Sequence, residues 1–312
     1  MMRRSLSTTI SQNPWWVVWV PWVFVVLWSG GFAFAKIGLL YAAPLTFLAL
    51  RYVVLVALLG AIYIVLRPPL PSSARQWWDQ IVVGFCIQAV YFVLTYFAFI
   101  LGVSAGAFGV IISFQPILVA LSVGRFADEN VSAGRWLGIV CGLAGAVIVI
   151  VATSDFDSTS LLGVLASIGA LAGMTTGTLY EKRFGSAQHP VSANLIQYAV
   201  ALIVCAPFAL LLEDIRIEWN TEFIVALGYL VIANSLISLT LLLAMIRQGE
   251  VSRVSSLFFL VPPTAALFAW ALIGETMPPA AWLGMVAAVF GVALAGGMQW
   301  RGKASADSKA AR

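Results

Sequence analysis

The stretch Trp136-Leu137-Gly138 returns unchanged as Trp282-Leu283-Gly284, 146 residues further along the chain. The same offset pairs other uncommon residues from the first apolar segment to the last. These pairs are Gly31 with Gly177, Lys36 with Lys182, Pro44 with Pro190, Tyr52 with Tyr198, Ala98 with Ala244, Pro116 with Pro262 and Glu129 with Glu275. One constant register over so much of the chain indicates an internal duplication.

The composition places the duplicated segments in a lipid bilayer. Of the 312 residues, 62% are apolar and only 10% are charged, which excludes a soluble domain. Apolar runs of about 20 residues span the hydrocarbon as helices, whereas barrel strands would show alternation. Ten such runs cover residues 15–36, 44–66, 80–101, 104–124, 135–153, 161–182, 193–212, 222–245, 253–273 and 279–299. The sequence therefore predicts an all-α polytopic membrane protein with ten transmembrane helices.

The duplication divides these helices into two repeats of five, over residues 15–153 and 161–299. Because five is odd, the second repeat enters the membrane from the opposite face, and the repeats form an inverted pair. Secondary transporters are commonly built in this way. Residues 1–14 and 300–312 remain as a short N-terminal segment and a basic C-terminal tail, both expected in the cytoplasm.

The positive charges predict the orientation of the helices. With the N-terminus in the cytoplasm, fourteen Lys and Arg residues lie on the inner side, and only Lys36 and Arg216 lie on the outer side. Charges that flank helices also explain the net charge of +4 without nucleic acid as a partner. The apolar run after Arg3 and Arg4 is too long for a signal peptide, so we interpret it as a retained helix in the cytoplasmic membrane.

Residues that support catalysis or metal binding are scarce. His189 is the only histidine, and it lies in a predicted cytoplasmic loop. Cys86, Cys141 and Cys205 stand singly in apolar segments, which gives neither a metal-binding spacing nor a disulfide pattern. The sequence also lacks the phosphate-binding motif GxxxxGK[ST]. We expect no enzyme activity, no cofactor and no metal, so any transport must draw its energy from gradients.

Three stretches of the sequence resemble the EamA-type branch of the drug/metabolite transporter superfamily. They are Trp28-Ser-Gly-Gly-Phe-Ala-Phe-Ala-Lys36, Pro44-Leu-Thr-Phe-Leu-Ala-Leu-Arg51, and the segment from Pro262 to Glu275 that Trp282-Leu-Gly284 follows. The resemblance covers about residues 15–298 and implies ten helices in two five-helix repeats. One departure is Phe126-Ala-Asp-Glu129, where the first repeat lacks the Gly274-Glu275 of the second.

Two amides at equivalent places in the repeats are the leading candidates for a substrate site. Gln88 in the third helix and Asn234 in the eighth differ by the repeat offset, and both lie near the middle of the membrane. Substrate sites of repeat-built transporters lie at that depth. Gln88, Tyr91 and Thr95 form one polar stripe, and Ser238 follows Asn234 by one turn. The alternative is that these amides only hydrogen-bond between helices.

Arg51 lies about eight residues inside the second helix, where an isolated charge in hydrocarbon costs roughly 2.5–3.5 kcal/mol. Its position near the outer leaflet lets the side chain reach headgroups or neighbouring carbonyls as a structural anchor. The alternative is a cavity-lining role, in which Arg51 contacts an anionic substrate. We favour the structural anchor, because Pro44 marks the helix entrance only seven residues earlier.

Prolines and aromatic residues supply further candidates for the site. Gln115 precedes Pro116 in the fourth helix, and Pro262 with Pro263 interrupts the ninth helix at the matching place. Both helices lose backbone hydrogen bonds there, so we expect kinks beside the cavity. Trp28 in the first helix and Tyr180 in the sixth are candidates for aromatic walls, although aromatic residues also gather at membrane interfaces.

Glycines predict where helices approach each other closely. Gly138 and Gly145 in the fifth helix return as Gly284 and Gly291 in the tenth. Spacings of this kind let backbones come into contact in membranes. The two helices can pair within one protomer or between protomers, so both a monomer and a homodimer are compatible with the sequence.

Together these features predict a secondary transporter or facilitator that exports small metabolites, such as amino acids or related compounds, by alternating access. Gln88, Tyr91, Gln115 and Asn234 would supply neutral hydrogen bonds around one central cavity. A transporter of anionic or phosphorylated metabolites, such as nucleotide sugars, is the main alternative. It would need several cations in the cavity, and only Arg51 and Lys36 are candidates for that role. An intramembrane enzyme is a more distant alternative.

Overall fold

The structure is a computed structural model that describes residues 14–103, 105–126, 131–153, 160–185, 188–248, 251–273 and 278–297. Within these residues the chain is helical, and no strand longer than an isolated bridge occurs. Six helices are long and apolar enough to cross a membrane. The predicted terminal segments, apart from Pro14, and the loop over residues 154–159 lie outside the described residues.

The first half of the chain forms α2 (Pro14–Leu39), α3 (Pro44–Leu66), a rod of α4 (Ala74–Val83), η1 (Gly84–Tyr91) and α5 (Phe92–Ile100), then α6 (Ala105–Ile112), α7 (Gln115–Phe126) and α8 (Ala133–Thr153). The second half forms α9 (Leu161–Phe184), α10 (Pro190–Leu212), a rod of α11 (Thr221–Tyr229), η3 (Leu230–Leu239) and α12 (Thr240–Gln248), a rod of α13 (Val251–Ser256), η4 (Leu257–Leu260) and α14 (Val261–Ile273), and finally α15 (Pro279–Gly297). These elements lie over the predicted apolar runs. The largest difference is at the third run, which begins at Ala74 instead of residue 80, because Ser73 caps the helix by accepting a hydrogen bond from the backbone N–H of Gln76.

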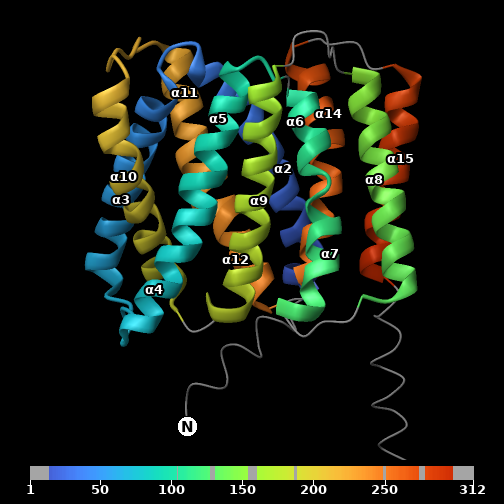
Figure 1. Cartoon of the computed structure of the whole chain (residues 1–312), viewed down its shortest axis with the longest axis horizontal. Helices are drawn as coiled ribbons and strands as arrows, with labels where there is room; N and C mark the ends of the chain where they lie inside the picture. The colour runs from blue at the N-terminus through green and yellow to red at the C-terminus, as the bar shows by residue number, and fades with distance from the viewer. Residues whose placement is uncertain are drawn as a thin grey trace, which may run out of the picture.

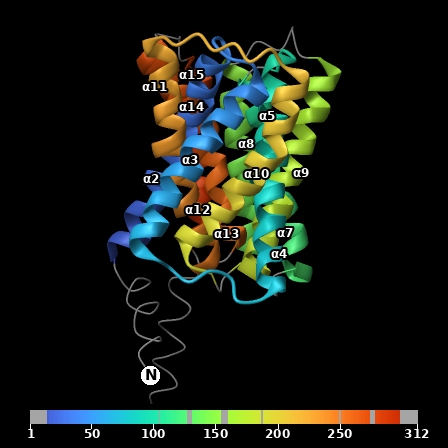
Figure 2. The ribbon, with the colours of Figure 1, turned by 90° about the vertical axis from the view of Figure 1, so that its left-hand side faces the viewer.

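Two pairs of helices lie at the two ends of the long axis in Figure 1. At one end α3 packs against α10, and at the other end α8 packs against α15. Figure 2 looks onto the α3/α10 pair, with α8 and α15 behind it. Each pair joins helices from the two halves of the chain.

Two groups of helices lie between these pairs. In the α2 group, α2 packs against the rod from α11 to α12 and the rod from α13 to α14. In the α9 group, α9 packs against the rod from α4 to α5 and against α6 and α7. Each group therefore takes one helix from one half of the chain and the remaining helices from the other half.

Glycines bring α8 and α15 into backbone contact within the chain. A Cβ at Gly284 would lie 2.8 Å from the carbonyl oxygen of Gly145 and 2.8 Å from the nitrogen of Val149. At Gly291, a Cβ would lie 2.8 Å from the carbonyl oxygen of Gly138. The contact predicted from these glycines is thus made inside one protomer.

The rods that contain Gln88 and Asn234 both widen into π-helix. The π-helical segment η1 begins at Gly84 and η3 begins at Leu230, which is the same 146-residue offset. Tyr52 of α3 donates a hydrogen bond of 2.5 Å to the carbonyl of Gln88. Tyr198 of α10 donates one of 3.0 Å to the carbonyl of Ser235. A π-turn interrupts the regular pairing of backbone groups, and the two tyrosines satisfy carbonyls at these interruptions.

Regular helix also changes at the predicted proline kinks. α6 stops at Ile112 and α7 resumes at Gln115, directly before Pro116. In the equivalent rod, the 3₁₀ segment η4 ends at Leu260, and Pro262 and Pro263 lie in the first turn of α14. Proline has no N–H to donate, so it is best tolerated in the first turn of a helix.

The connections at the upper end of Figure 1 are held by polar contacts. The loop before α3 meets the segment before α11 through a bridge between Ala42 and Ile217. Glu213 accepts hydrogen bonds from the backbone N–H groups of Leu45, at 3.0 Å, and Thr46, at 2.7 Å, which caps the start of α3. Tyr41 donates a hydrogen bond to Glu222, and this contact with a carboxylate raises the pKa of the Tyr41 hydroxyl.

Candidate functional site

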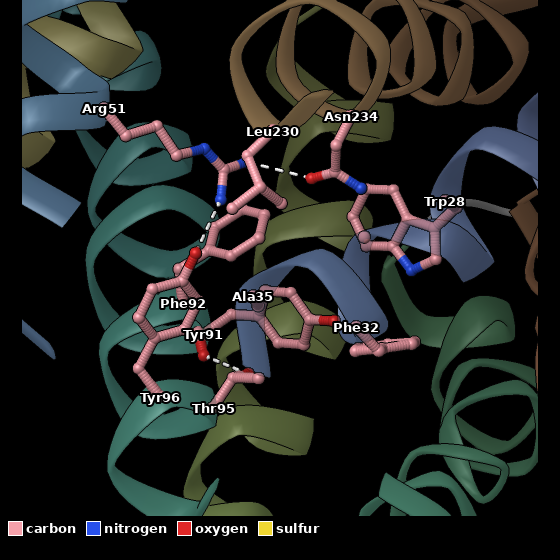
Figure 3. Close-up of a pocket in the computed structure, with 11 residues that line it drawn as sticks. Trp28, Phe32, Ala35, Arg51, Tyr91, Phe92, Thr95, Tyr96, Leu230 and Asn234 are labelled. Carbon is pink, nitrogen blue, oxygen red and sulfur yellow. Dashed lines mark hydrogen bonds between the residues drawn. The ribbon is translucent and has the colours of Figure 1, made fainter. Parts of the chain in front are cut away.

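A small cavity lies at the centre of the bundle, between the α2 group and the α9 group. Figure 3 shows the side chains around it. The α2 group contributes Trp28, Gly31, Phe32, Ala35, Leu230 and Asn234, the α9 group contributes Tyr91, Phe92, Thr95 and Tyr96, and α3 contributes Arg51. Its volume of about 10 Å³ holds about one water molecule. The groups are therefore closed around a space that a metabolite can enter only if they move apart.

The dominant feature of the cavity is the buried side chain of Arg51. Only 1% of the residue is exposed, so the guanidinium lies inside the bundle and not at lipid headgroups, which were one of the two positions expected for a structural anchor. Its Nε and Nη2 donate to the hydroxyl of Ser235 at 2.9 and 2.6 Å. Nη2 also donates to Oδ1 of Asn234 at 2.9 Å, and Nη1 donates to the hydroxyl of Tyr96 at 3.3 Å.

Within the described part of the chain, every group that contacts this guanidinium is electrically neutral. Besides the three hydrogen-bonded residues, the ring of Phe92 lies 4.5 Å from the guanidinium carbon and supplies a cation–π contact. No carboxylate of the described residues forms an ion pair with Arg51. These hydrogen bonds use four of the five guanidinium N–H groups, which leaves one on Nη1 for a further acceptor.

Aromatic rings form much of the remaining wall of the cavity. Trp28 and Tyr91 stack with their centroids 6.1 Å apart and their planes inclined by 21°. Phe92 lies 6.2 Å from Trp28 and completes this side of the cavity. Gly31 brings α2 close to η3, because a Cβ at that position would overlap the side-chain amide of Asn234. The site thus combines one cation with polar hydroxyl and amide groups and an apolar wall.

The structure brings four of the predicted site residues together at this cavity. They are Trp28, Arg51, Tyr91 and Asn234. Ser238 lies outside the cavity lining, and its hydroxyl donates to the carbonyl of Phe24 at 3.2 Å. Tyr180 is also remote from the cavity, because its hydroxyl donates to Oδ1 of Asp79 at 2.8 Å.

Gln88 and Gln115 are fully buried but do not belong to the described lining of this cavity. The side-chain nitrogen and oxygen of both amides lack hydrogen-bond partners in the described part of the protein. Buried amides without partners cost free energy, typically about 1–3 kcal/mol each in proteins. The roles of Gln88 and Gln115 in substrate binding therefore stay predictions. Their unpaired amide groups support these predictions, because they are available to hydrogen-bond a substrate.

The sequence did not indicate Ser235, Tyr96 or Phe92 as partners of Arg51. Ser235 is separated from Arg51 by 184 residues, and a single serine in an apolar helix carries no distinguishing signal. Tyr96 follows Phe92 by one turn, and both continue the face of Gln88. Each lies one residue after a member of the polar stripe, Tyr91 or Thr95, so widening that stripe by one residue would have included them.

Comparison with known proteins identifies the family of the chain. The sequence profile of the EamA-like transporter family matches residues 14–151 and again residues 161–297. A probable amino-acid metabolite efflux pump of Salmonella typhimurium is 26% identical over 81% of this chain and 85% of its own length. The uncharacterized transporter YvbV of Bacillus subtilis is 25% identical over 76% of this chain and 77% of its own length.

Two further matches extend the comparison. An S-adenosylmethionine/S-adenosylhomocysteine transporter of Chlamydia trachomatis is 25% identical over 81% of this chain and 80% of its own length. A crystal structure of a protein 18% identical in sequence has the same fold, with a TM-score of 0.74 over 88% of this chain and 95% of that chain. The apolar helices and the double match to one profile identify a multi-pass membrane protein that belongs to the EamA-like transporter family.

Proposed function

We propose that this chain is a secondary transporter that exports small metabolites bearing a carboxylate, such as amino acids or related compounds, across the cytoplasmic membrane. The observation that carries the proposal is Arg51, a buried cation that only neutral groups contact. A buried charge without a counter-ion is costly, and an arriving carboxylate would compensate it. The efflux pump of Salmonella typhimurium, which is named for amino-acid metabolites, supports this substrate class and the direction.

A single carboxylate suits the cavity better than a phosphorylated group. Arg51 is the only cation among the described lining residues. The other cation considered from the sequence, Lys36, lies with its Nζ 5.4 Å from the ring of Phe99. A nucleotide sugar carries at least two negative charges and would call for several cations. We therefore favour a substrate with one carboxylate over a phosphorylated substrate. The aromatic rings of Trp28 and Tyr91 would face the rest of that substrate.

Transport would proceed by alternating access between two inverted five-helix repeats, residues 15–153 and 161–299. Three observations support the hypothesis of two repeats. The family profile matches twice, the π-helical segments η1 and η3 begin at equivalent positions, and the equivalent helices α8 and α15 contact each other through equivalent glycines. The closed cavity fits an occluded state. Rocking of the α2 group against the α9 group would open that cavity to one side at a time.

The lower end of Figure 1 would face the cytoplasm. Arg67, Arg75, Arg183 and Arg247 belong to helix ends or connections at that end, whereas Lys36 and Arg216 belong to the upper end. An excess of Lys and Arg marks the cytoplasmic side of membrane proteins.

Binding measurements with matched ligands test the substrate class. The purified protein would be titrated with amino acids and with the corresponding primary amides, which keep the side chain and lose the negative charge. We expect tighter binding of the carboxylates. Arg51→Gln should weaken carboxylate binding more than tenfold, which corresponds to a charge-assisted hydrogen bond of roughly 1.5–3 kcal/mol, and leave amide binding nearly unchanged.

Arg51→Lys and Arg216→Gln serve as matched variants. Lys keeps the charge without the planar fork, so it should recover only part of the affinity. Arg216→Gln removes a positive charge at the upper end and should bind like the unmodified protein. If folded Arg51→Gln loses thermal stability but keeps carboxylate affinity, Arg51 is a structural anchor and the proposal is wrong.

A further inference from the structure

The two ends of the central cavity are closed by different chemistry. Towards the upper end, Phe32 of the α2 group meets Phe99 and Phe108 of the α9 group, with ring centroids 6.4 and 5.8 Å apart. At the lower end, Arg247 of α12 forms an ion pair with Glu181 of α9. Both closures cross from one group to the other, but only the lower one joins opposite charges.

The carboxylate of this ion pair is buried, and the Arg247 side chain is 12% exposed. Glu181 is 0% exposed, and its Oε1 accepts a hydrogen bond from Nε of Arg247. Nη1 of Arg247 donates to the carbonyl of Gln188 at 3.0 Å, in the connection after α9. A Cβ at Gly185 would overlap the Glu181 carboxylate, so the absence of a side chain there makes room for it.

The repeat offset shows that this closure is one-sided. The positions that correspond to Glu181 and Arg247 in the first half are Ala35 and Leu101, which are both apolar. A pair of charges has therefore been placed at one end of an otherwise duplicated arrangement. If the ion pair served only to pack the helices, the first half would be expected to carry an equivalent ion pair at the other end.

We propose that Glu181 and Arg247 form the lower gate of the central cavity. The α2 group carries Arg247 and the α9 group carries Glu181, so the groups cannot separate at the lower end without breaking the pair. A second cavity of about 70 Å³ adjoins Arg247 and is lined also by Asn194 and Thr240. This space lets the arginine side chain leave Glu181. The proposal rests on the alternating-access part of the proposed function and not on the identity of the substrate.

Breaking the pair shifts the resting protein towards opening at the lower end. Thr95, which lines the central cavity, is replaced by Cys in a background without Cys86, Cys141 and Cys205, and a membrane-impermeant maleimide is added to either face of oriented vesicles. Glu181→Gln and Arg247→Gln should each raise the rate of labelling from the lower face about tenfold, the scale of one charge-assisted hydrogen bond. Labelling from the upper face should fall. No substrate is present in these measurements.

Arg75→Gln is the matched control. It removes the Arg75–Asp79 ion pair, of 3.1 Å, which lies at the same end of the bundle but within α4 alone. Its labelling rates should equal those of the parent protein. Equal acceleration in Arg75→Gln, or parent-like rates in the two gate variants, would overturn the gate.

Two more variants keep the test decisive if a neutral substitution prevents folding. Glu181→Asp and Arg247→Lys retain the charges and lose the close contact, so they should show a smaller increase in the same direction. Parent-like rates in folded protein would again overturn the proposal. If labelling of the parent protein does not depend on the face, both alternating access and the gate are refuted. If labelling depends on the face but the gate variants leave it unchanged, only the gate is refuted.

Discussion

Replacing Gly284 by Ala should destabilise the protein, although alanine is the better helix former. The new Cβ would lie 2.8 Å from the carbonyl oxygen of Gly145 and from the nitrogen of Val149, and 2.9 Å from Cγ2 of Val149. Carbon contacts are most favourable at about 3.5–4.0 Å, so α8 and α15 must separate by roughly 0.7 Å. A gap of that size forfeits about a quarter to a half of the attraction between facing atoms.

The expected net effect follows from two opposing magnitudes. Overpacking of a tight contact costs about 1–3 kcal/mol, and the change from glycine to alanine in a helix recovers about 1 kcal/mol. The variant should therefore lose up to about 2 kcal/mol. Gly60, in the exposed part of α3, is the matched control, because a Cβ there meets nothing within 4 Å. Gly60→Ala should gain up to about 1 kcal/mol.

Thermal melting of the purified variants, followed by size-exclusion chromatography after heating, measures the difference. Gly284→Ala should lower the melting temperature by a few degrees, and Gly60→Ala should leave it unchanged or raise it. Equal shifts for the two variants would refute the reasoning, because helix propensity alone would then govern both positions.

Three other substitutions probe different features. Gln88→Met should raise thermal stability and slow transport, because the amide has no described partner yet is predicted to serve the substrate; a loss of stability would show that the amide is already satisfied. Glu213→Ala removes the cap of α3 and should cost about 1 kcal/mol in thermal melts, whereas Glu213→Gln should cost less. Tyr52→Phe and Tyr198→Phe should each lower the free energy of unfolding by about 1 kcal/mol, since each leaves one carbonyl of a π-helical segment without its donor. An effect at only one of the two positions would contradict equivalent roles of the two tyrosines.

The positions of the helices could be predicted from the sequence because apolar length and helix-ending residues are local signals. Pro44 and Pro190 begin α3 and α10, where the missing N–H of proline has no intrahelical partner to lose. The closest helix contact could also be anticipated, since the glycines of α8 and α15 are spaced regularly. Its location within one protomer could not, because a glycine ladder does not specify which helix covers it.

The side chains around the cavity were harder to predict because η1 and η3 are π-helices. A period of 3.6 residues places Ser238 on the face of Asn234 and Gln88 on the face of Tyr91. In η1 the wider π-turns change that relation, and Gln88 is absent from the described lining of the cavity. Ser238 still faces α2, as Asn234 does beside Gly31, but it contacts Phe24, seven residues before Gly31, and so lies outside the lining. The inward direction of Arg51 also has no local signal, because its acceptors Ser235 and Asn234 come from the other half of the chain.

The exchange of first helices between the halves has a consequence for how the protein is made. α2 ends at Leu39, but the other helices of the α2 group begin only at Thr221, about 180 residues later. At roughly 5–20 residues per second, a ribosome needs about 10–40 s to produce them. During that time the face of α2 that carries Ser29 and Gly31 lacks its final neighbours. Biogenesis of this protein therefore depends on α2 remaining stable in the bilayer by its own apolar length, and a chain halted before α11 would leave its first helix without the neighbours it is shaped to meet.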